Sequence, residues 1–141
     1  MICTVAKKEI EDIKPTNILP QTPYWGRLKD QQGFIPNGFE VTISKDILGT
    51  STSGLSKTQD DLLVLIKYIN DSFCYAYVPY GPKLEPTIEN QGVFLEELSE
   101  TIKPHLPENC MFIRYDLIWE NQWAKEEEYF DASGNWNGPP Q

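Results

Sequence analysis

The sequence predicts a layered α/β (α+β) domain in which helices pack on a mixed, mostly antiparallel β-sheet. Residues 62–69 and 73–78 are β-rich apolar runs. They are joined by turn-forming residues at 70–72, so they indicate an antiparallel hairpin. Residues 89–103 then place apolar side chains at helical spacing and glutamates between them, which is typical of an amphipathic helix.

The amino-terminal half adds a helix and a strand to this layout. Thr22 is suited to cap a helix, Pro23 to fill its first turn and Gly33 to end it. Residues 39–43 alternate between apolar and polar side chains, which predicts a half-buried strand. Residues 44–60 are rich in Gly, Ser and Thr, and we expect them to form a mobile surface loop.

The carboxyl-terminal part divides into a last core element and an acidic segment. Pro104 and Pro107 end the amphipathic helix, and residues 110–115 predict a third core strand. Beyond it the chain is acidic, rich in tryptophan and finally rich in Gly and Pro. We therefore expect one subdomain over residues 1–118 and a separate segment over residues 119–141.

Composition limits the class of function. The 141 residues suit one domain, and 40% hydrophobic with 23% charged residues is typical of a globular chain. The formal net charge of −9 repels phosphate backbones and anionic headgroups. Binding of nucleic acid or of a lipid surface through charge is therefore not expected of this chain alone.

The sequence also indicates a compartment. No apolar run approaches the roughly 20 residues that span a bilayer, so we expect no membrane span. The first residues lack the hydrophobic core of a signal peptide. Cys3, Cys74 and Cys110 have no paired spacing, and we interpret them as reduced, with the latter two in buried strands. These features favour a cytoplasmic protein.

Residues for common catalytic chemistry are scarce. His105 is the only histidine and lies between two prolines, which argues against Ser-His, Cys-His and metal-ligand systems. The glutamates at 126–128 with Asp131 are typical of a solvated charged surface. No closely spaced glycines occupy a strand-to-helix junction, where they would cradle a phosphate. We therefore assign no catalytic residue, no metal site and no cofactor.

Two residue pairs are candidates for a binding site. Trp25 and Lys29 share a helical face and could hold a sugar or nucleotide that carries phosphate. A core tryptophan with a lysine at its edge is the alternative. Arg114 and Asp116 share a strand face, where they could form an internal ion pair or orient an anionic substrate.

Four segments, taken in order, resemble motifs of the FemABX family of peptidoglycan aminoacyltransferases. Residues 21–29 resemble the opening motif, in which Gln precedes a Trp-Gly-like pair and a Lys. Residues 77–82 resemble the family's aromatic strand that ends in Gly-Pro. Residues 94–98 and 112–116 resemble the helix and the strand that follow. The similarity covers about residues 17–119.

This resemblance implies a fold and an activity. Family members are similar to two fused GNAT-like halves. They transfer an amino acid from aminoacyl-tRNA to a peptidoglycan precursor, lipid II or UDP-MurNAc-pentapeptide, and so build the interpeptide bridge in cell-wall biogenesis and the maintenance of cell shape. Residues 1–118 would be the amino-terminal GNAT-like half. The second half, with its acyl-transfer region, has no counterpart in these 141 residues.

The resemblance also implies substrate-binding residues. Lys29 matches a motif lysine implicated in binding the diphosphate of the precursor, with Trp25 beside it. Gly81 matches the loop at the substrate groove, and Tyr80 stands where the family often has a basic residue. Arg114 matches a strand end, for which a structural role is favoured over substrate contact.

Three interpretations stay open. The chain is the amino-terminal part of such a transferase, a non-catalytic module that binds muropeptide or nucleotide-sugar, or a structural subunit of a split transferase. As the amino-terminal part of a transferase, the chain is expected to bind the precursor, to contact aminoacyl-tRNA only through the missing half, and to be inactive alone. We expect it in the cytoplasm or peripherally at the inner face of the membrane. Exposed rings in the acidic segment favour self-association of the isolated domain.

Overall fold

The computed structural model describes residues 2–49, 57–120 and 126–138 of the chain. These residues form one β-sheet, two longer helices and several short helical turns. In chain order the elements are β1 (Cys3–Lys8), η1 (Ile10–Asp12), η2 (Leu19–Gln21), α1 (Pro23–Gln31), β2 (Ile35–Ser44), η3 (Lys45–Leu48), β3 (Lys57–Tyr68), β4 (Cys74–Val78), α2 (Ile88–Ile102), η4 (Lys103–His105), β5 (Cys110–Tyr115) and α3 (Glu126–Tyr129).

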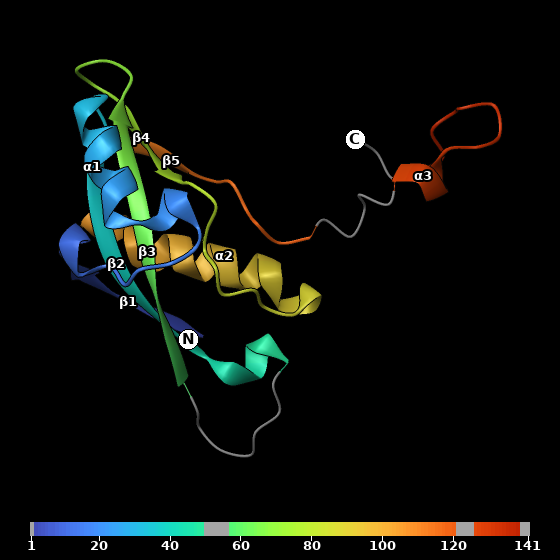
Figure 1. The fold of residues 1–141 in the computed structure, drawn as a ribbon, viewed down its shortest axis with the longest axis horizontal. Helices are drawn as coiled ribbons and strands as arrows, with labels where there is room; N and C mark the ends of the chain where they lie inside the picture. The colour runs from blue at the N-terminus through green and yellow to red at the C-terminus, as the bar shows by residue number, and fades with distance from the viewer. Residues whose placement is uncertain (1, 50–56, 121–125, 139–141) are drawn as a thin grey trace.

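The sheet has five strands in the order β1-β2-β3-β4-β5 (Figure 1). Strands β1 to β4 pair antiparallel with one another in turn, and β3 and β4 form the predicted hairpin, with Leu65 opposite Tyr77. Strand β5 runs parallel to β4 because α2 carries the chain back across the sheet before β5 begins. The predicted α/β class with a mixed, mostly antiparallel sheet is confirmed.

Helix α2 covers one face of the sheet and builds the larger core. Phe94, Leu98 and Ile102 lie four residues apart on one side of the helix and are fully buried. They pack against alternate residues of the strands, among them Phe39 and Val41 of β2. The helical spacing of the sequence predicts an apolar side made of Leu95, Leu98 and Ile102. Leu98 and Ile102 are fully buried, whereas Leu95 is only partly buried against the same core.

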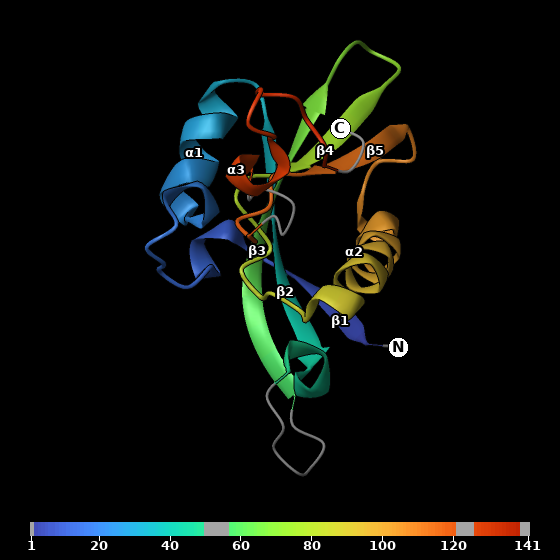
Figure 2. The same ribbon diagram turned by 90° about the vertical axis from the view of Figure 1, so that its right-hand side faces the viewer.

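Helix α1 covers the opposite face, as Figure 2 shows. Thr22 caps this helix by accepting a hydrogen bond from the Trp25 N–H at 3.3 Å, and Pro23 occupies its first position. Gly33 follows its end with a φ of 87°, a left-handed conformation that suits glycine. The predicted start and stop of this helix are therefore confirmed.

Two features of the amino-terminal half differ from the sequence analysis. Strand β1 was not expected, and it pairs antiparallel with β2 along its length. Residues 44–60 were expected to form a loop, but η3 buries Ile47 and β3 begins at Lys57. The ladder between β2 and β3 extends beyond the apolar residues of β3. Polar side chains support this extension, since Gln59 of β3 donates a hydrogen bond to Thr42 of β2 at 3.3 Å. Residues 50–56 of the expected loop lie outside the described residues.

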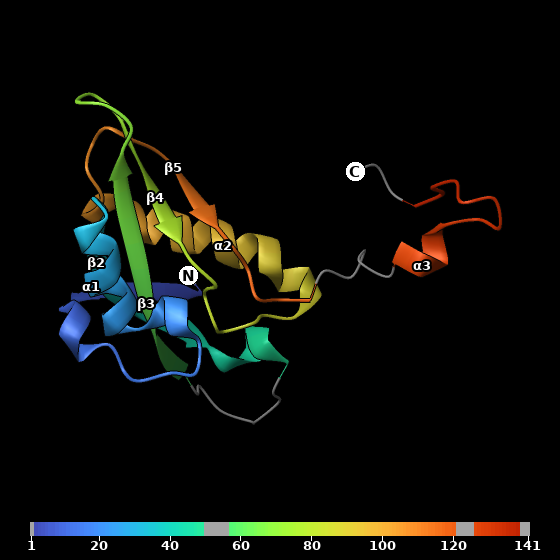
Figure 3. The same cartoon turned by 45° about the horizontal axis from the view of Figure 1, so that its top comes forward.

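Strand β5 lies at the margin of the sheet beside β4 (Figure 3) and is not a core strand. Ile113 and Tyr115 pack against the α2 core, whereas Met111 and Phe112 are 50% and 49% exposed. The apolar composition of the strand predicted its conformation, but its place at the edge depends on the strand order, which the sequence analysis did not derive.

Trp119 belongs to the core, although the sequence analysis assigned it to the acidic segment. The indole is buried, with its ring centroid 6.2 Å from that of Phe94, and its Nε1 donates to the Pro82 carbonyl at 3.1 Å. Helix α3 lies away from the sheet (Figure 1). After it, Trp136 packs on the ring of Phe130 at a centroid distance of 5.3 Å.

Candidate functional site

Helix α1 presents a lysine against two aromatic rings. The Nζ of Lys29 lies 5.0 Å from the centroid of the Trp25 ring and 5.6 Å from that of Phe34. It also donates to the Gln32 side-chain oxygen at 3.0 Å. Trp25 and Lys29 therefore share a helical face as their spacing predicts, and the ammonium group is held over the rings.

Two further cations lie over aromatic rings on this side of the sheet. The Nζ of Lys67, near the end of β3, is 5.0 Å from the Phe34 ring. The guanidinium carbon of Arg114 in β5 is 5.5 Å from the ring of Tyr77 in β4. Each such contact contributes about 0.5–1 kcal/mol where it is exposed to solvent.

One small core supports all three rings. Trp25, Phe34 and Tyr77 pack against the buried cluster that contains Leu63 and Leu65 of β3. We call the rings and their cations the cation–aromatic face. Its members are Trp25, Lys29, Phe34, Lys67, Tyr77 and Arg114.

The charges on this face are only partly neutralised. Arg114 forms an ion pair with Asp116, in which a guanidinium nitrogen lies 3.3 Å from the carboxylate. Within the described ranges, neither Lys29 nor Lys67 has a carboxylate partner. In a chain of net charge −9, the face is thus a local positive site beside apolar rings.

The internal ion pair predicted as one alternative for Arg114 is present, and Tyr77 supports it. The Tyr77 hydroxyl donates to Asp116 at 2.5 Å. Burial, together with this hydrogen bond and the negative charge of Asp116, raises the pKa of Tyr77 to about 12. The hydroxyl therefore stays protonated at neutral pH and keeps the carboxylate of Asp116 beside Arg114.

The loop after β4 is fixed to the same strand end. The Gly81 N–H donates to the Asp116 carbonyl at 3.1 Å, and the Asp116 N–H donates to the Val78 carbonyl at 3.0 Å. Tyr80 has a φ of 48° and is 53% exposed. Tyr80 lines a hollow of about 600 Å³ together with Asp116 and Trp119. The structure thus brings Tyr80 and Gly81 to the end of the strand that carries Arg114.

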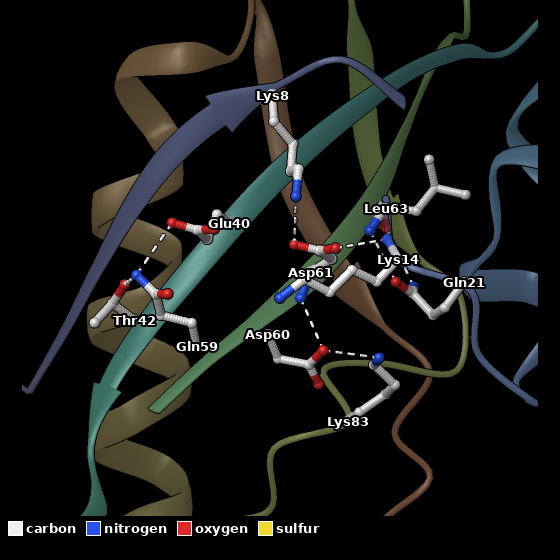
Figure 4. Close-up of polar contacts among 10 residues, drawn as sticks. All are labelled: Lys8, Lys14, Gln21, Glu40, Thr42, Gln59, Asp60, Asp61, Leu63 and Lys83. Carbon is white, nitrogen blue, oxygen red and sulfur yellow. Dashed lines mark hydrogen bonds and ion pairs between the residues drawn. The ribbon is translucent and has the colours of Figure 1, made fainter. Parts of the chain in front are cut away.

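Gln21, which the sequence analysis treated only as the start of a motif, is a buried structural residue. Its side-chain oxygen accepts from the Leu63 N–H at 2.8 Å, and its Nε2 donates to the carbonyls of Leu63 at 3.2 Å and Pro79 at 2.6 Å. Continuing the β3–β4 register would place Leu63 opposite Pro79, which has no N–H to donate. The Gln21 amide supplies the missing donor, and Figure 4 shows it beside Leu63.

A second buried polar group, Asp61, ties the amino terminus to β3 (Figure 4). Its carboxylate accepts from the Lys8 ammonium at 2.9 Å and from the Lys14 N–H at 2.7 Å. Burial alone would raise the pKa of Asp61, but the hydrogen bond from Lys14 and the charge of Lys8 outweigh it and lower the pKa. Its partners make Asp61 a structural anchor of β1.

One polar atom on the cation–aromatic face lacks a partner. The Nε1 of Trp25 is buried, and no acceptor for it exists among the described residues. An unpaired buried donor costs about 1–3 kcal/mol. Such a donor is a group that a bound ligand or an ordered water can satisfy.

The five sequence-predicted binding residues fall into two groups. Trp25 and Lys29 are in contact on α1, while Tyr80, Gly81 and Arg114 meet around Asp116. Tyr77 links the groups, because it packs in the same cluster as Trp25 and lies under Arg114. No pattern in the sequence singled out Phe34, Lys67 or Tyr77 as binding residues, although Phe34 directly follows the glycine that ends the helix.

The remaining features of interest are His105, possible metal ligands and possible membrane-spanning helices. His105 is exposed and contacts the Phe39 ring at a centroid distance of 5.6 Å. In the part of the chain that is described, no group of three or more His, Cys, Asp or Glu side chains is placed to hold a metal ion. Likewise, no described helix is long and apolar enough to cross a membrane.

Comparison of the chain with protein-family models, with curated proteins and with solved structures finds no significant match.

Proposed function

We propose that the chain binds the diphosphate-containing precursor of peptidoglycan, as the amino-terminal part of a FemABX-type aminoacyltransferase. The observation that supports this most directly is Lys29, an ammonium group held over two rings with no carboxylate partner among the described residues. Lys29 is also the residue to which the family resemblance assigns the diphosphate.

The chemistry of the face suits such a ligand. A diphosphate accepts charge-assisted hydrogen bonds, which are about twice as strong as neutral ones. Rings such as Trp25 and Phe34 can pack on the apolar side of a sugar or base next to that phosphate. Lys67 adds a second positive charge at the same ring, 5.0 Å from Phe34. Because the chain as a whole carries a net charge of −9, an anion would be repelled elsewhere and attracted to this positively charged face.

The amino acid donor is assigned to another part of the enzyme. Charged tRNA is a polyanion, and a chain of net charge −9 opposes its approach. Transfer also needs groups that stabilise oxyanion charge and hold donor and acceptor together. We assign no catalytic residue to the described residues, so the role proposed for this chain is recognition of the acceptor substrate.

Calorimetry with UDP-MurNAc-pentapeptide tests the binding role. Lys29→Gln should weaken binding by about ten- to a hundredfold, because a hydrogen bond to a charged group contributes about 1.5–3 kcal/mol. Arg27→Gln is the matched control, since Arg27 lies on the same helix but is paired with Glu11 at 2.6 Å. Equal affinity of the wild type and Lys29→Gln would show that Lys29 only covers the tryptophan.

A second experiment separates the transferase part from a binding module. The purified chain is incubated with charged tRNA and precursor, and extended product is sought by mass spectrometry. We expect binding without product. Product formed by this chain alone would contradict the assignment of the transfer chemistry to another part of the enzyme. If the chain mixed with the remainder of a FemABX-type enzyme never transfers an amino acid, the interpretation as a non-catalytic binding module is favoured.

A further inference from the structure

The free edge of β5 and the residues after it carry a self-complementary pattern. Residues 112–118 are Phe, Ile, Arg, Tyr, Asp, Leu and Ile. Tyr115 is the central residue of this segment. Arg114 and Asp116 lie directly on either side of it, and the next two residues in each direction are apolar. An antiparallel pair of such segments, centred on Tyr115, would place unlike charges and apolar side chains opposite each other throughout.

The backbone of this segment is oriented for such pairing. Both the N–H and the carbonyl of Asp116 point towards the β4 side, where they bond Val78 and Gly81. Because these groups alternate along a strand, those of Tyr115, the last residue of β5, point to the free edge. Leu117 presents its groups to the same edge once the strand is extended by two residues. In the sheet order β5 is the last strand, and no described strand pairs with its outer side. Two copies could therefore exchange hydrogen bonds between their Tyr115 backbones.

The side chains along this edge are also exposed. Phe112 is 49% exposed, Leu117 is 39% exposed and Ile118 is 42% exposed. Arg114 has a 64% exposed side chain. A hollow of about 590 Å³ lies beside Met111 and other residues at this edge. An apolar edge strand that no described strand covers is unusual in a monomer, because it is a template for another strand.

We propose that two copies of this chain pair antiparallel through residues 112–118, which extends β5 beyond Tyr115 and joins the two sheets. In this dimer Arg114 of each copy faces Asp116 of the other, Ile113 faces Leu117, and Phe112 faces Ile118. Exchange at the three outward-facing positions gives about six backbone hydrogen bonds. The charges decide the register, since centring the pair on Arg114 would set two guanidinium groups against each other.

Reversal of single charges tests this register. Arg114→Asp places Asp against Asp116 of the other copy, and Asp116→Arg places two arginines together. Each variant alone should be monomeric at concentrations where the wild type forms a dimer, as measured by sedimentation equilibrium. A mixture of the two variants restores both unlike pairs, so an equimolar mixture should form a heterodimer at wild-type strength.

Thermal melting and circular dichroism show whether each variant is folded. Asp116 also holds Tyr77, so the mixture serves as the control for damage within one copy: recovery of the dimer requires both folds to be intact. Leu117→Pro removes an edge N–H that makes no backbone hydrogen bond within the described residues of one copy, and it should also abolish the dimer. A wild type that stays monomeric at its highest soluble concentration would overturn the proposal. So would single variants that dimerise like the wild type, or a mixture of folded variants that stays monomeric.

Discussion

Replacement of Gln21 by leucine should destabilise the fold substantially, although Gln21 lies just before a helix on the outside of the sheet, where a substitution would ordinarily have a small effect. The side chain is 1% exposed and makes three hydrogen bonds to the backbone of Leu63 and Pro79. Leucine has a similar volume, so the change removes the hydrogen bonds with little loss of packing. It leaves the Leu63 N–H and two carbonyls without these partners in a place that water does not reach.

The magnitude follows from these groups. A buried N–H left unpaired costs about 1–3 kcal/mol, and each carbonyl that loses its donor costs about 0.5–1.5 kcal/mol. Additional apolar burial by leucine offsets roughly 1 kcal/mol of this. We therefore expect Gln21→Leu to lower the free energy of unfolding by about 3 kcal/mol. For a chain of 141 residues this corresponds to a fall in Tm of roughly 10 °C.

Urea unfolding followed by circular dichroism measures this loss. Gln31→Leu is the control, because Gln31 ends α1, is exposed and should change stability by less than about 0.5 kcal/mol. The m-values of the variants should agree, which shows that the unfolded states are comparable. A loss below about 1 kcal/mol for Gln21→Leu would refute the view that its amide completes the β3–β4 ladder.

Two further substitutions test neighbouring contacts. Asp61→Asn should cost about 1.5–3 kcal/mol at neutral pH by removing the charged partner of Lys8. Because folding lowers the pKa of Asp61, its stabilisation is present above the unfolded pKa of about 3.9 and is lost as pH falls through the folded value. The difference between wild type and Asp61→Asn in urea unfolding should therefore shrink below about pH 4, and a constant difference would contradict this. Gly81→Ala should cost about 1–3 kcal/mol, since a Cβ there would lie 3.0 Å from the Gln21 Nε2. Gly92→Ala is the control, because no atom lies within 4 Å of the new Cβ. It should stabilise α2 by about 0.5–1 kcal/mol, as measured by thermal melting. Equal effects of the two substitutions on stability would refute the crowding at Gly81.

The sequence was most informative where local chemistry and burial agree. Thr22, Pro23 and Gly33 define the ends of α1 because capping and left-handed φ are local properties. The hairpin of β3 and β4 was likewise predicted, since a turn separates two apolar runs. Strand β1 was missed because its charged and apolar residues do not form a long apolar run, and its conformation depends on pairing with β2.

The candidate site was only partly predictable, for a similar reason. Spacing of four residues was enough to place Trp25 beside Lys29. The positions of Phe34 and Tyr77 under further cations depend on the sheet register, which no local pattern contains. Gln21 was recognised as part of a motif but not as a buried residue, because a lone glutamine gives no signal for burial. Only its contacts with Leu63 and Pro79 reveal that role.

The same contacts connect the parts of the candidate site to one another. Gln21 stands two residues before α1, which carries Lys29, and its amide holds the Pro79 carbonyl. Two residues further, the Gly81 N–H bonds the Asp116 carbonyl, and the Asp116 carboxylate pairs with Arg114. A chain of short polar contacts thus runs from the start of α1 to the end of β5. Segments that are far apart in the sequence form one structural unit, so a change at Gln21 should alter the affinity for the proposed precursor as well as stability.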